Sequence, residues 1–233
     1  MPGMGEPPPQ PAAPTAGPFE LTRGGLCLDF VNTWGDRARP ETDQLRSFAD
    51  FLGFAVQAGL LDEPRRHRLE RRMAGALGEG EAFGATLQLR ESLYRIFAGL
   101  ARGRVATARD LAGLNTVLKE GLAHLRIEAR TADPPAGFAW RFEPSDLATA
   151  PLWPIARSAA ELLTSPDAAR VTQCDGSDCT WLFLDRSRTR RAFQRVRRAI
   201  EHLSGADDLD VRRDERAAGA AHGRADGAGR ALL

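Results

Sequence analysis

Two neighbouring cysteines are the strongest candidate for chemistry in this chain. Cys174 and Cys179 are separated by four residues that include Gly176, and apolar segments lie on either side. A short polar loop of this kind lets two thiolates turn toward one ion, as in a zinc knuckle. A structural zinc ion usually has four ligands, and no second cysteine pair lies nearby. Zinc binding is therefore one interpretation, and a redox pair or two inert cysteines in a hairpin are the others.

An arginine-rich segment follows the cysteines, with seven arginines and no acidic residue from Arg186 to Arg198. A helix over residues 189–203 would place its apolar residues on one face and Arg191, Arg195 and Arg198 on the opposite one. Guanidinium groups pair with phosphates and release counterions, which favours contact with DNA. Since the chain has 31 arginines and one lysine, a solvated surface helix is the alternative. The candidate DNA contacts are Arg186, Arg188, Arg190, Arg191, Arg195 and Arg198.

Two polar residues near the N-terminus are candidate ligand contacts. Asp29 lies within the apolar run 26–31 and Asn32 follows it directly. We expect this run to be a buried strand or an extended segment rather than a helix. A carboxylate in such a run either binds a ligand or anchors a loop by hydrogen bonds. The ligand-binding interpretation places a pocket near Cys27, Asp29, Asn32 and Trp140.

Composition indicates a folded chain without a membrane or secretory segment. The 233 residues are 42% hydrophobic and 27% charged, with a formal net charge of +1. No run of about 18 apolar residues occurs and no signal-peptide pattern opens the chain, so we expect a cytoplasmic protein with no membrane partner. A Gly-rich phosphate loop, a His-Glu-x-x-His helix and a nucleophile-elbow serine are all missing. We therefore expect no enzymatic activity.

The elements that position these residues are mostly helical. Apolar residues recur at helical spacing in four segments, and a charged stretch over 64–77 predicts a further, more solvated helix. Apolar and polar residues alternate over 125–129 and 138–142, which predicts one β-hairpin. Thr42 is the expected N-cap of the first of these helices, and Thr107 with Asp110 resembles a capping box. The predicted helices cover residues 43–58, 64–77, 89–100, 107–122 and 152–163.

The predicted fold class is mainly α (α+β). A helical N-terminal domain with one β-hairpin is followed by a small zinc-ribbon-like hairpin and a basic helix. Seven of the fifteen prolines lie in the first 18 residues, and a segment so poor in apolar side chains cannot offset its ordering entropy. The predicted divisions are a disordered leader (1–18), the helical domain (19–165), the finger module with its arginine-rich helix (166–203) and a disordered tail (204–233).

Residues 24–33, 152–163 and 173–188 resemble the bacterial CGNR zinc-finger proteins, and the likeness extends over about residues 19–191. The resemblance implies a mostly helical ABATE domain, described as a stress-induced transcription regulator, joined to a zinc finger that binds DNA. In that family the finger has two cysteine pairs, the second continuing into Cys-Gly-Asn-Arg. The first pair corresponds to Cys174 and Cys179.

The second cysteine pair and the Cys-Gly-Asn-Arg motif are absent here, since no cysteine follows Cys179. Two thiolates completed by water or by His202 should hold zinc far less tightly than four thiolates. Residues 192–233 are either a diverged segment or the product of a shifted reading frame.

These observations predict a bacterial transcription regulator that binds DNA through its arginine-rich, zinc-finger-like module. The helical domain would then sense a small-molecule signal or form a homodimer. The alternative is a ligand-binding or protein-interaction domain with a degenerate finger.

Overall fold

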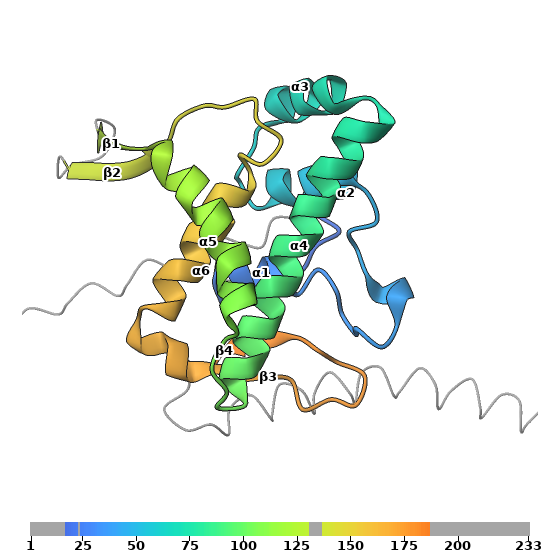
Figure 1. Cartoon of the computed structure of the whole chain (residues 1–233), viewed down its shortest axis with the longest axis vertical. Helices are drawn as coiled ribbons and strands as arrows, with labels where there is room; N and C mark the ends of the chain where they lie inside the picture. The colour runs from blue at the N-terminus through green and yellow to red at the C-terminus, as the bar shows by residue number, and fades with distance from the viewer. Residues whose placement is uncertain (1–16, 23, 131–136, 187–233) are drawn as a thin grey trace, which may run out of the picture. The chain divides into compact units, whose positions relative to one another are not determined.

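Most of the described chain is helical. The structure is a computed structural model that describes residues 17–22, 24–130 and 137–186. It confirms the mainly α class with small β-hairpins (Figure 1). The helices are α1 (Leu26–Val31), α2 (Phe48–Gln57), α3 (Glu63–Met73), α4 (Ala76–Ala101), α5 (Ala108–Ala123) and α6 (Leu152–Leu163). The strands are β1 (Leu125–Arg130), β2 (Gly137–Phe142), β3 (Val171–Gln173) and β4 (Leu182–Leu184), and short 3₁₀ turns lie at Pro40–Thr42 and Pro166–Arg170.

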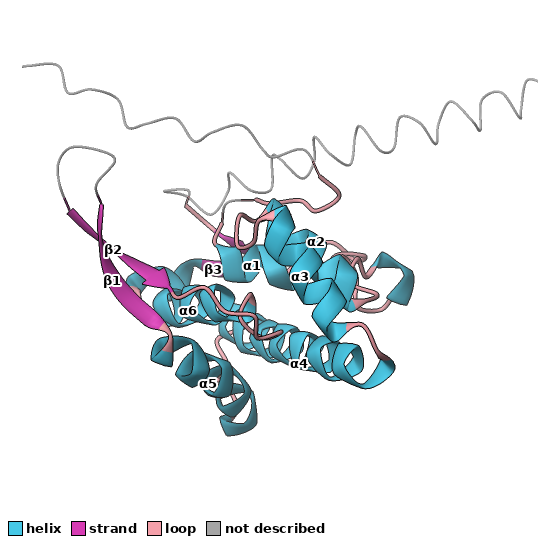
Figure 2. Cartoon of the chain, turned by 90° about the horizontal axis from the view of Figure 1, so that it is seen from above, coloured by secondary structure: helices cyan, strands magenta, loops and turns pink. Residues whose placement is uncertain are grey.

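Helix α4 contacts more of the other elements than any other helix does. Its buried side chains Leu89, Leu93, Ile96 and Phe97 recur at helical spacing and form one apolar face. That helix packs against α1, α2, α5, α6 and β3. Figure 2 shows α2 and α3 above α4 and α5 below it. One long amphipathic helix thus organises the core.

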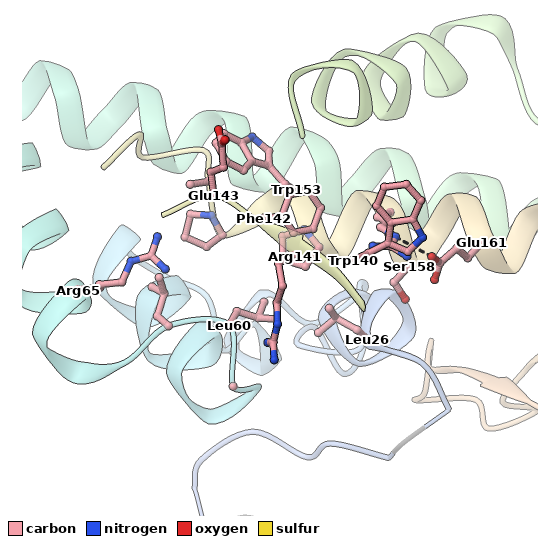
Figure 3. A pocket seen from close by; sticks show the side chains of 16 residues that line it. Leu26, Leu60, Arg65, Trp140, Arg141, Phe142, Glu143, Trp153, Ser158 and Glu161 are labelled. Atoms are coloured by element: carbon pink, nitrogen blue, oxygen red, sulfur yellow. Dashed lines mark hydrogen bonds and ion pairs between the residues drawn. The ribbon is translucent and has the colours of Figure 1, made fainter. Parts of the chain in front are cut away.

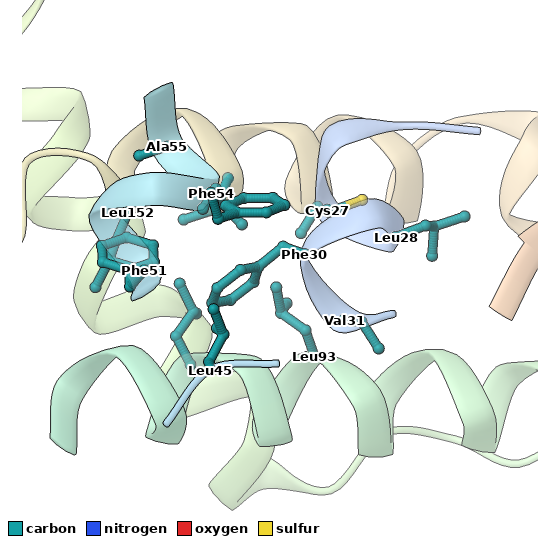
Figure 4. Packing of buried hydrophobic residues seen from close by; sticks show 14 of the residues in the cluster. Cys27, Leu28, Phe30, Val31, Leu45, Phe51, Phe54, Ala55, Leu93 and Leu152 are labelled. Atoms are coloured by element: carbon teal, nitrogen blue, oxygen red, sulfur yellow. The ribbon is translucent and has the colours of Figure 1, made fainter. Parts of the chain in front are cut away.

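A group of phenylalanines fills the space beside α4 (Figure 4). The ring centroids of Phe30 and Phe54 are 5.6 Å apart, and those of Phe30 and Phe51 are 5.9 Å apart. Helix α1 contributes five buried residues to this region. One of them is Cys27, and burial raises the pKa of its thiol to about 12. Cys27 is therefore a core residue that stays protonated at neutral pH.

The prediction of a strand at residues 26–31 is wrong, because this segment forms helix α1. Gly25, with φ of +139°, turns the chain into the helix, and its carbonyl oxygen accepts from Asp29 N at 3.1 Å. Helix α1 contacts both α4 and α6. A short run buried on nearly every side has no polar face, so its periodicity cannot distinguish a helix from a strand.

The first predicted helix begins later than expected, at Phe48 rather than near residue 43. Thr42 is not its N-cap: Thr42 ends a 3₁₀ turn, and its hydroxyl accepts a hydrogen bond from Asp36 N at 2.9 Å. The N-cap is Ser47, whose hydroxyl accepts from Asp50 N at 3.2 Å. The serine is in extended backbone conformation, as N-caps are.

Thr107 is confirmed as an N-cap, while Asp110 contacts its hydroxyl and not its backbone N–H as in a full capping box. The Thr107 hydroxyl accepts from Asp110 N at 3.2 Å, and the Asp110 carboxylate lies 2.8 Å from the same hydroxyl. Helix α4 starts earlier than predicted, at Ala76, because Gly75 with φ of +142° separates it from α3. Three glycines in the first half of the helix, Gly78, Gly80 and Gly84, weaken its apolar pattern, which explains why the sequence indicates only its second half.

Each of the two hairpins is antiparallel. The predicted hairpin is confirmed, with Ile127 paired to Trp140 and Ala129 to Phe138, while its tip at 131–136 lies outside the described residues. The second hairpin pairs β3 with β4, and its residues Val171 and Leu182 belong to the core cluster of the helices. The β3–β4 hairpin therefore completes the helical core instead of having a core of its own.

Candidate functional site

The structure brings Cys174 and Cys179 together in the loop between β3 and β4. Cys174 N donates to Trp181 O at 2.9 Å, which extends the hairpin by one pair. A Cβ placed on Gly176 would lie 3.5 Å from Cys174 Sγ and 3.1 Å from the Cβ of Cys179. Both cysteines thus border the same glycine, and both are partly buried. The second hairpin predicted from the sequence is present, with both cysteines in the loop between its strands.

The two cysteines provide only half of a structural zinc site. Within the described ranges, no cluster of three or more His, Cys, Asp or Glu residues has a geometry suited to a metal ion. His202, the candidate third ligand, lies outside those ranges. Two thiols are half of the four donors that a structural zinc ion usually has.

The cysteine loop is fastened to the segment that follows α1. Thr180 N donates to Gly35 O at 2.9 Å, and Arg37 Nη1 donates to Thr180 Oγ1 at 3.1 Å. Asp178 forms an ion pair of 3.0 Å with Arg39. Both backbone and side-chain contacts therefore join the cysteine loop to the segment that follows α1.

Arg37 is a mostly buried cation that holds this junction together. Its guanidinium stands 3.5 Å from the ring centroid of Tyr94 and pairs with Glu91 at 3.1 Å. Burial lowers the pKa of Arg37 below that of a free guanidinium, whereas the Glu91 carboxylate opposes this shift. In a chain with 31 arginines, the sequence contains no signal that distinguishes Arg37 from a surface cation.

Asp29 and Asn32 connect helix α1 and its C-terminal end to other segments of the chain. Asn32 Nδ2 donates to Leu182 O at 2.9 Å and Leu182 N donates to Asn32 Oδ1 at 2.8 Å, so the amide pairs with β4 as a neighbouring strand would. Asp29 Oδ1 accepts from the backbone N and the hydroxyl of Thr22, at 2.8 and 2.7 Å. Both residues are buried. Of the two interpretations offered by the sequence, these contacts match the loop anchor.

The arginines predicted to contact DNA fall almost entirely beyond the described residues. Arg186 is exposed just after β4. The other five, Arg188, Arg190, Arg191, Arg195 and Arg198, lie outside the described ranges.

A pocket of about 490 Å³ lies between β2, α6 and the segment that joins α2 to α3 (Figure 3). Trp140, Phe142 and Trp153 provide its aromatic walls, and Leu26 and Leu60 provide aliphatic ones. Of the four residues expected near one pocket, Trp140 lines this one, whereas Cys27, Asp29 and Asn32 are not among its lining residues.

Five charged side chains line the same pocket: Arg65, Arg141, Glu143, Arg157 and Glu161. Arg157 pairs with Glu161 at 2.7 Å and lies 5.6 Å from the ring centroid of Trp140. Glu143 pairs at 2.8 Å with Arg126, which is outside the lining. The two remaining arginines form no ion pair with any carboxylate of the described chain. The pocket thus combines aromatic walls with an excess of positive charge.

Comparison with protein families gives one match, over residues 24–166, to the family described as "ABATE: putative stress-induced transcription regulator". The matched segment makes up more than half of the chain. The chain belongs to the ABATE family. The ABATE match runs from the residues before α1 through α6, so it includes the tryptophan-lined pocket and excludes the cysteine hairpin. No curated protein matches the chain.

Within the described part of this ABATE protein, no helix has both the length and the apolar character needed to cross a bilayer. This holds for α4 as well, which is the longest of the described helices.

Proposed function

We propose that this protein is a DNA-binding transcription regulator, in which the arginine-rich segment after β4 contacts DNA phosphates and the ABATE domain is the sensory part. Membership of a family described as transcription regulators carries the proposal. The block of seven arginines without an acidic residue from Arg186 to Arg198 supplies the cations that phosphates require. On this proposal the protein acts in the cytoplasm and has no enzymatic activity.

The position of the arginine block supports a mechanical link between this block and the ABATE domain. The block begins two residues after β4, and β4 is held by Asn32 at the end of α1. Helix α1 is packed against α4 and α6 in the middle of the ABATE domain. A displacement of α1 would therefore be transmitted to the strand from which the arginine block extends.

Salt-dependent DNA binding tests the proposal. If Arg191, Arg195 and Arg198 each neutralise about one phosphate, replacing all three with Ala should reduce the slope of log affinity against log salt by roughly three. Fluorescence anisotropy of the full chain on a labelled duplex, from low to physiological salt, measures this slope. Binding should depend little on sequence, since phosphate contacts carry no direct sequence information.

A matched triple variant controls for the general loss of positive charge. Arg71, Arg72 and Arg104 are exposed and lie in or beside the helices of the ABATE domain. Their triple Ala variant loses the same formal charge and should keep a slope close to that of the parent. Equal slopes for the parent and the Arg191/Arg195/Arg198 variant, or no complex at low salt, would refute DNA binding by this segment.

We also propose that Cys174 and Cys179 bind zinc weakly. Their shared position around Gly176 supports this, while the two missing ligands limit the affinity. Zinc measured by mass spectrometry after purification without chelator should be substoichiometric and should disappear when both cysteines are replaced with Ser. Replacing Cys27 with Ser should leave the zinc content unchanged. Equal zinc in the parent and the Cys174/Cys179 double variant would remove the metal from the proposal.

A second candidate function, assembly into a homodimer, is favoured by the exposed face of the β1–β2 hairpin. Ile127, Phe138 and Trp140 lie on one face by their register and are 60%, 80% and 53% exposed. Exposed apolar groups of this size, on a face to which the described parts of β1 and β2 contribute no charged side chain, are typical of contact surfaces. Light scattering should show a dimer that the Phe138→Asp variant converts to monomer. A monomeric parent at high concentration would exclude this candidate.

A further inference from the structure

The pocket between β2 and α6 has the size and walls of a small-molecule site. Its volume of about 490 Å³ is within the range of known ligand pockets. Trp153 is almost fully buried and is stacked on His124, with ring centroids 4.4 Å apart and planes 5° from parallel. This stack fixes one wall. Trp140 is about half exposed and provides an aromatic surface that solvent reaches.

The charges at the pocket favour an anion. Both carboxylates of the pocket lining, Glu143 and Glu161, are already paired with arginines. Figure 3 shows Arg141 extending from β2 toward Leu60 and Leu26, while Arg65 enters from α3. Neither arginine has a carboxylate partner in the described chain, although Arg65 donates to Ser145 O at 3.1 Å. Arginine pairs with carboxylates through two parallel hydrogen bonds, so both guanidiniums are suited to a carboxylate ligand.

We propose that this pocket binds a small aromatic carboxylate, with its ring against Trp140 and Phe142 and its carboxylate attracted by Arg65 and Arg141. The proposal of a binding site depends only on the lining and geometry of the pocket. Its role as the signal of a regulator rests on the proposed function.

Helix α1 provides a route from the pocket to the cysteine hairpin. Leu26 at its start lines the pocket, and Ser158, also in the lining, accepts a hydrogen bond from Cys27 N at 3.2 Å. At the other end of α1, Asn32 makes its two hydrogen bonds to Leu182 of β4. A ligand that displaces Leu26 or Ser158 would therefore move the helix that anchors β4.

Three matched probes test the ligand class on the full chain. Phenylacetate has the aromatic ring and the charge, phenylacetamide has the ring without the charge, and cyclohexylacetate has the charge without the ring. In calorimetry at low salt, phenylacetate should bind saturably and at least about fivefold more tightly than either of the others. Equal affinity of the amide would refute the anionic preference, and equal affinity of cyclohexylacetate would refute the aromatic one. No saturable binding of any probe would refute the site.

Substitutions in the lining locate the binding. The Arg141→Gln, Arg65→Gln and Trp140→Ala variants should each weaken phenylacetate binding by about fivefold or more, since each removes a charged or stacking contact. Two control variants should stay close to the parent: Arg72→Gln, on the same helix as Arg65 but outside the lining, and Leu122→Ala, an exposed apolar residue elsewhere. Arg65 also donates a hydrogen bond to Ser145 O, so the Arg65→Gln variant could fail to fold. In that case the Arg141→Gln variant provides the test. Unchanged binding in Arg141→Gln would overturn the proposal.

The DNA experiment separates this proposal from the proposed function. Saturating phenylacetate should change the affinity of the parent for DNA by about threefold or more, as expected for allosteric coupling, and should leave the Arg141→Gln variant unaffected. Ligand binding without any DNA complex would support the site and refute the regulator. Ligand binding with unchanged DNA affinity would support the site and refute its signalling role.

Discussion

Arginine serves two different purposes in this protein. Arg90 is 1% exposed, and its guanidinium pairs with both carboxylate oxygens of Asp43, at 2.6 and 2.7 Å. It also donates to Glu91 at 3.0 Å. Arg66, by contrast, pairs with Glu70 on α3, where both side chains are partly exposed. The same residue type is thus part of the interior at one position and part of the surface at another.

Replacing Arg90 should therefore cost far more stability than replacing Arg66. Arg90→Gln leaves the Asp43 carboxylate without its main partner, and we expect it to lower the free energy of unfolding by about 3–5 kcal/mol. Arg66→Gln removes a partly exposed pair and should cost about 0–1 kcal/mol. Urea denaturation followed by circular dichroism measures both. Equal losses in the two variants would contradict the structural role of Arg90.

At the scale of elements, close approach between helices determines which glycines are needed. Gly121 of α5 faces α6, where a Cβ on it would lie 2.8 Å from the Cβ of Trp153. Gly84 of α4 is exposed, and a Cβ there would have no atom within 4 Å. Both positions are helical, so the propensity of the sequence does not distinguish them.

Replacing Gly84 and replacing Gly121 with Ala should have opposite effects on the free energy of unfolding. Gly84→Ala should raise the free energy of unfolding by about 0.5–1 kcal/mol, since alanine favours a helix. Gly121→Ala should lower it by about 1–3 kcal/mol, because the added methyl group pushes α5 away from α6. The two variants control for each other in the same urea titration. Stabilisation of both would show that the α5–α6 approach is looser than the structure indicates.

At the scale of the molecule, the helical domain and the cysteine hairpin share one core. Val171 and Leu182 are buried against the helices, and the side chain of Asn32 pairs with the backbone of Leu182. The matched ABATE region nevertheless ends at residue 166. The family boundary and the boundary of the hydrophobic core therefore differ.

A truncation experiment measures this difference. A fragment of residues 17–165 loses the apolar contacts of the hairpin and leaves Asn32 buried without its partner. We expect it to be less stable than a fragment of residues 17–186 by about 3 kcal/mol or more. Chemical denaturation of the two fragments gives the comparison. If both unfold at the same denaturant concentration, the hairpin is an independent module.

The sequence alone was sufficient wherever local chemistry specifies local structure. The Thr107 N-cap, the alternation of the β1–β2 hairpin and the long apolar face of α6 are all encoded by neighbouring residues. The cysteine pair was likewise predicted to lie in a hairpin loop, because a polar, glycine-containing segment between apolar ones favours a turn.

Only the tertiary structure decided the features that depend on burial. The run 26–31 is a helix because it is enclosed by α4 and α6, and Asp29 and Asn32 serve as anchors because distant segments present partners to them. The pocket brings together Leu26, Arg65 and Trp140, which are far apart in the chain. Periodicity and spacing describe only nearby residues, whereas burial and pairing are set by long-range packing.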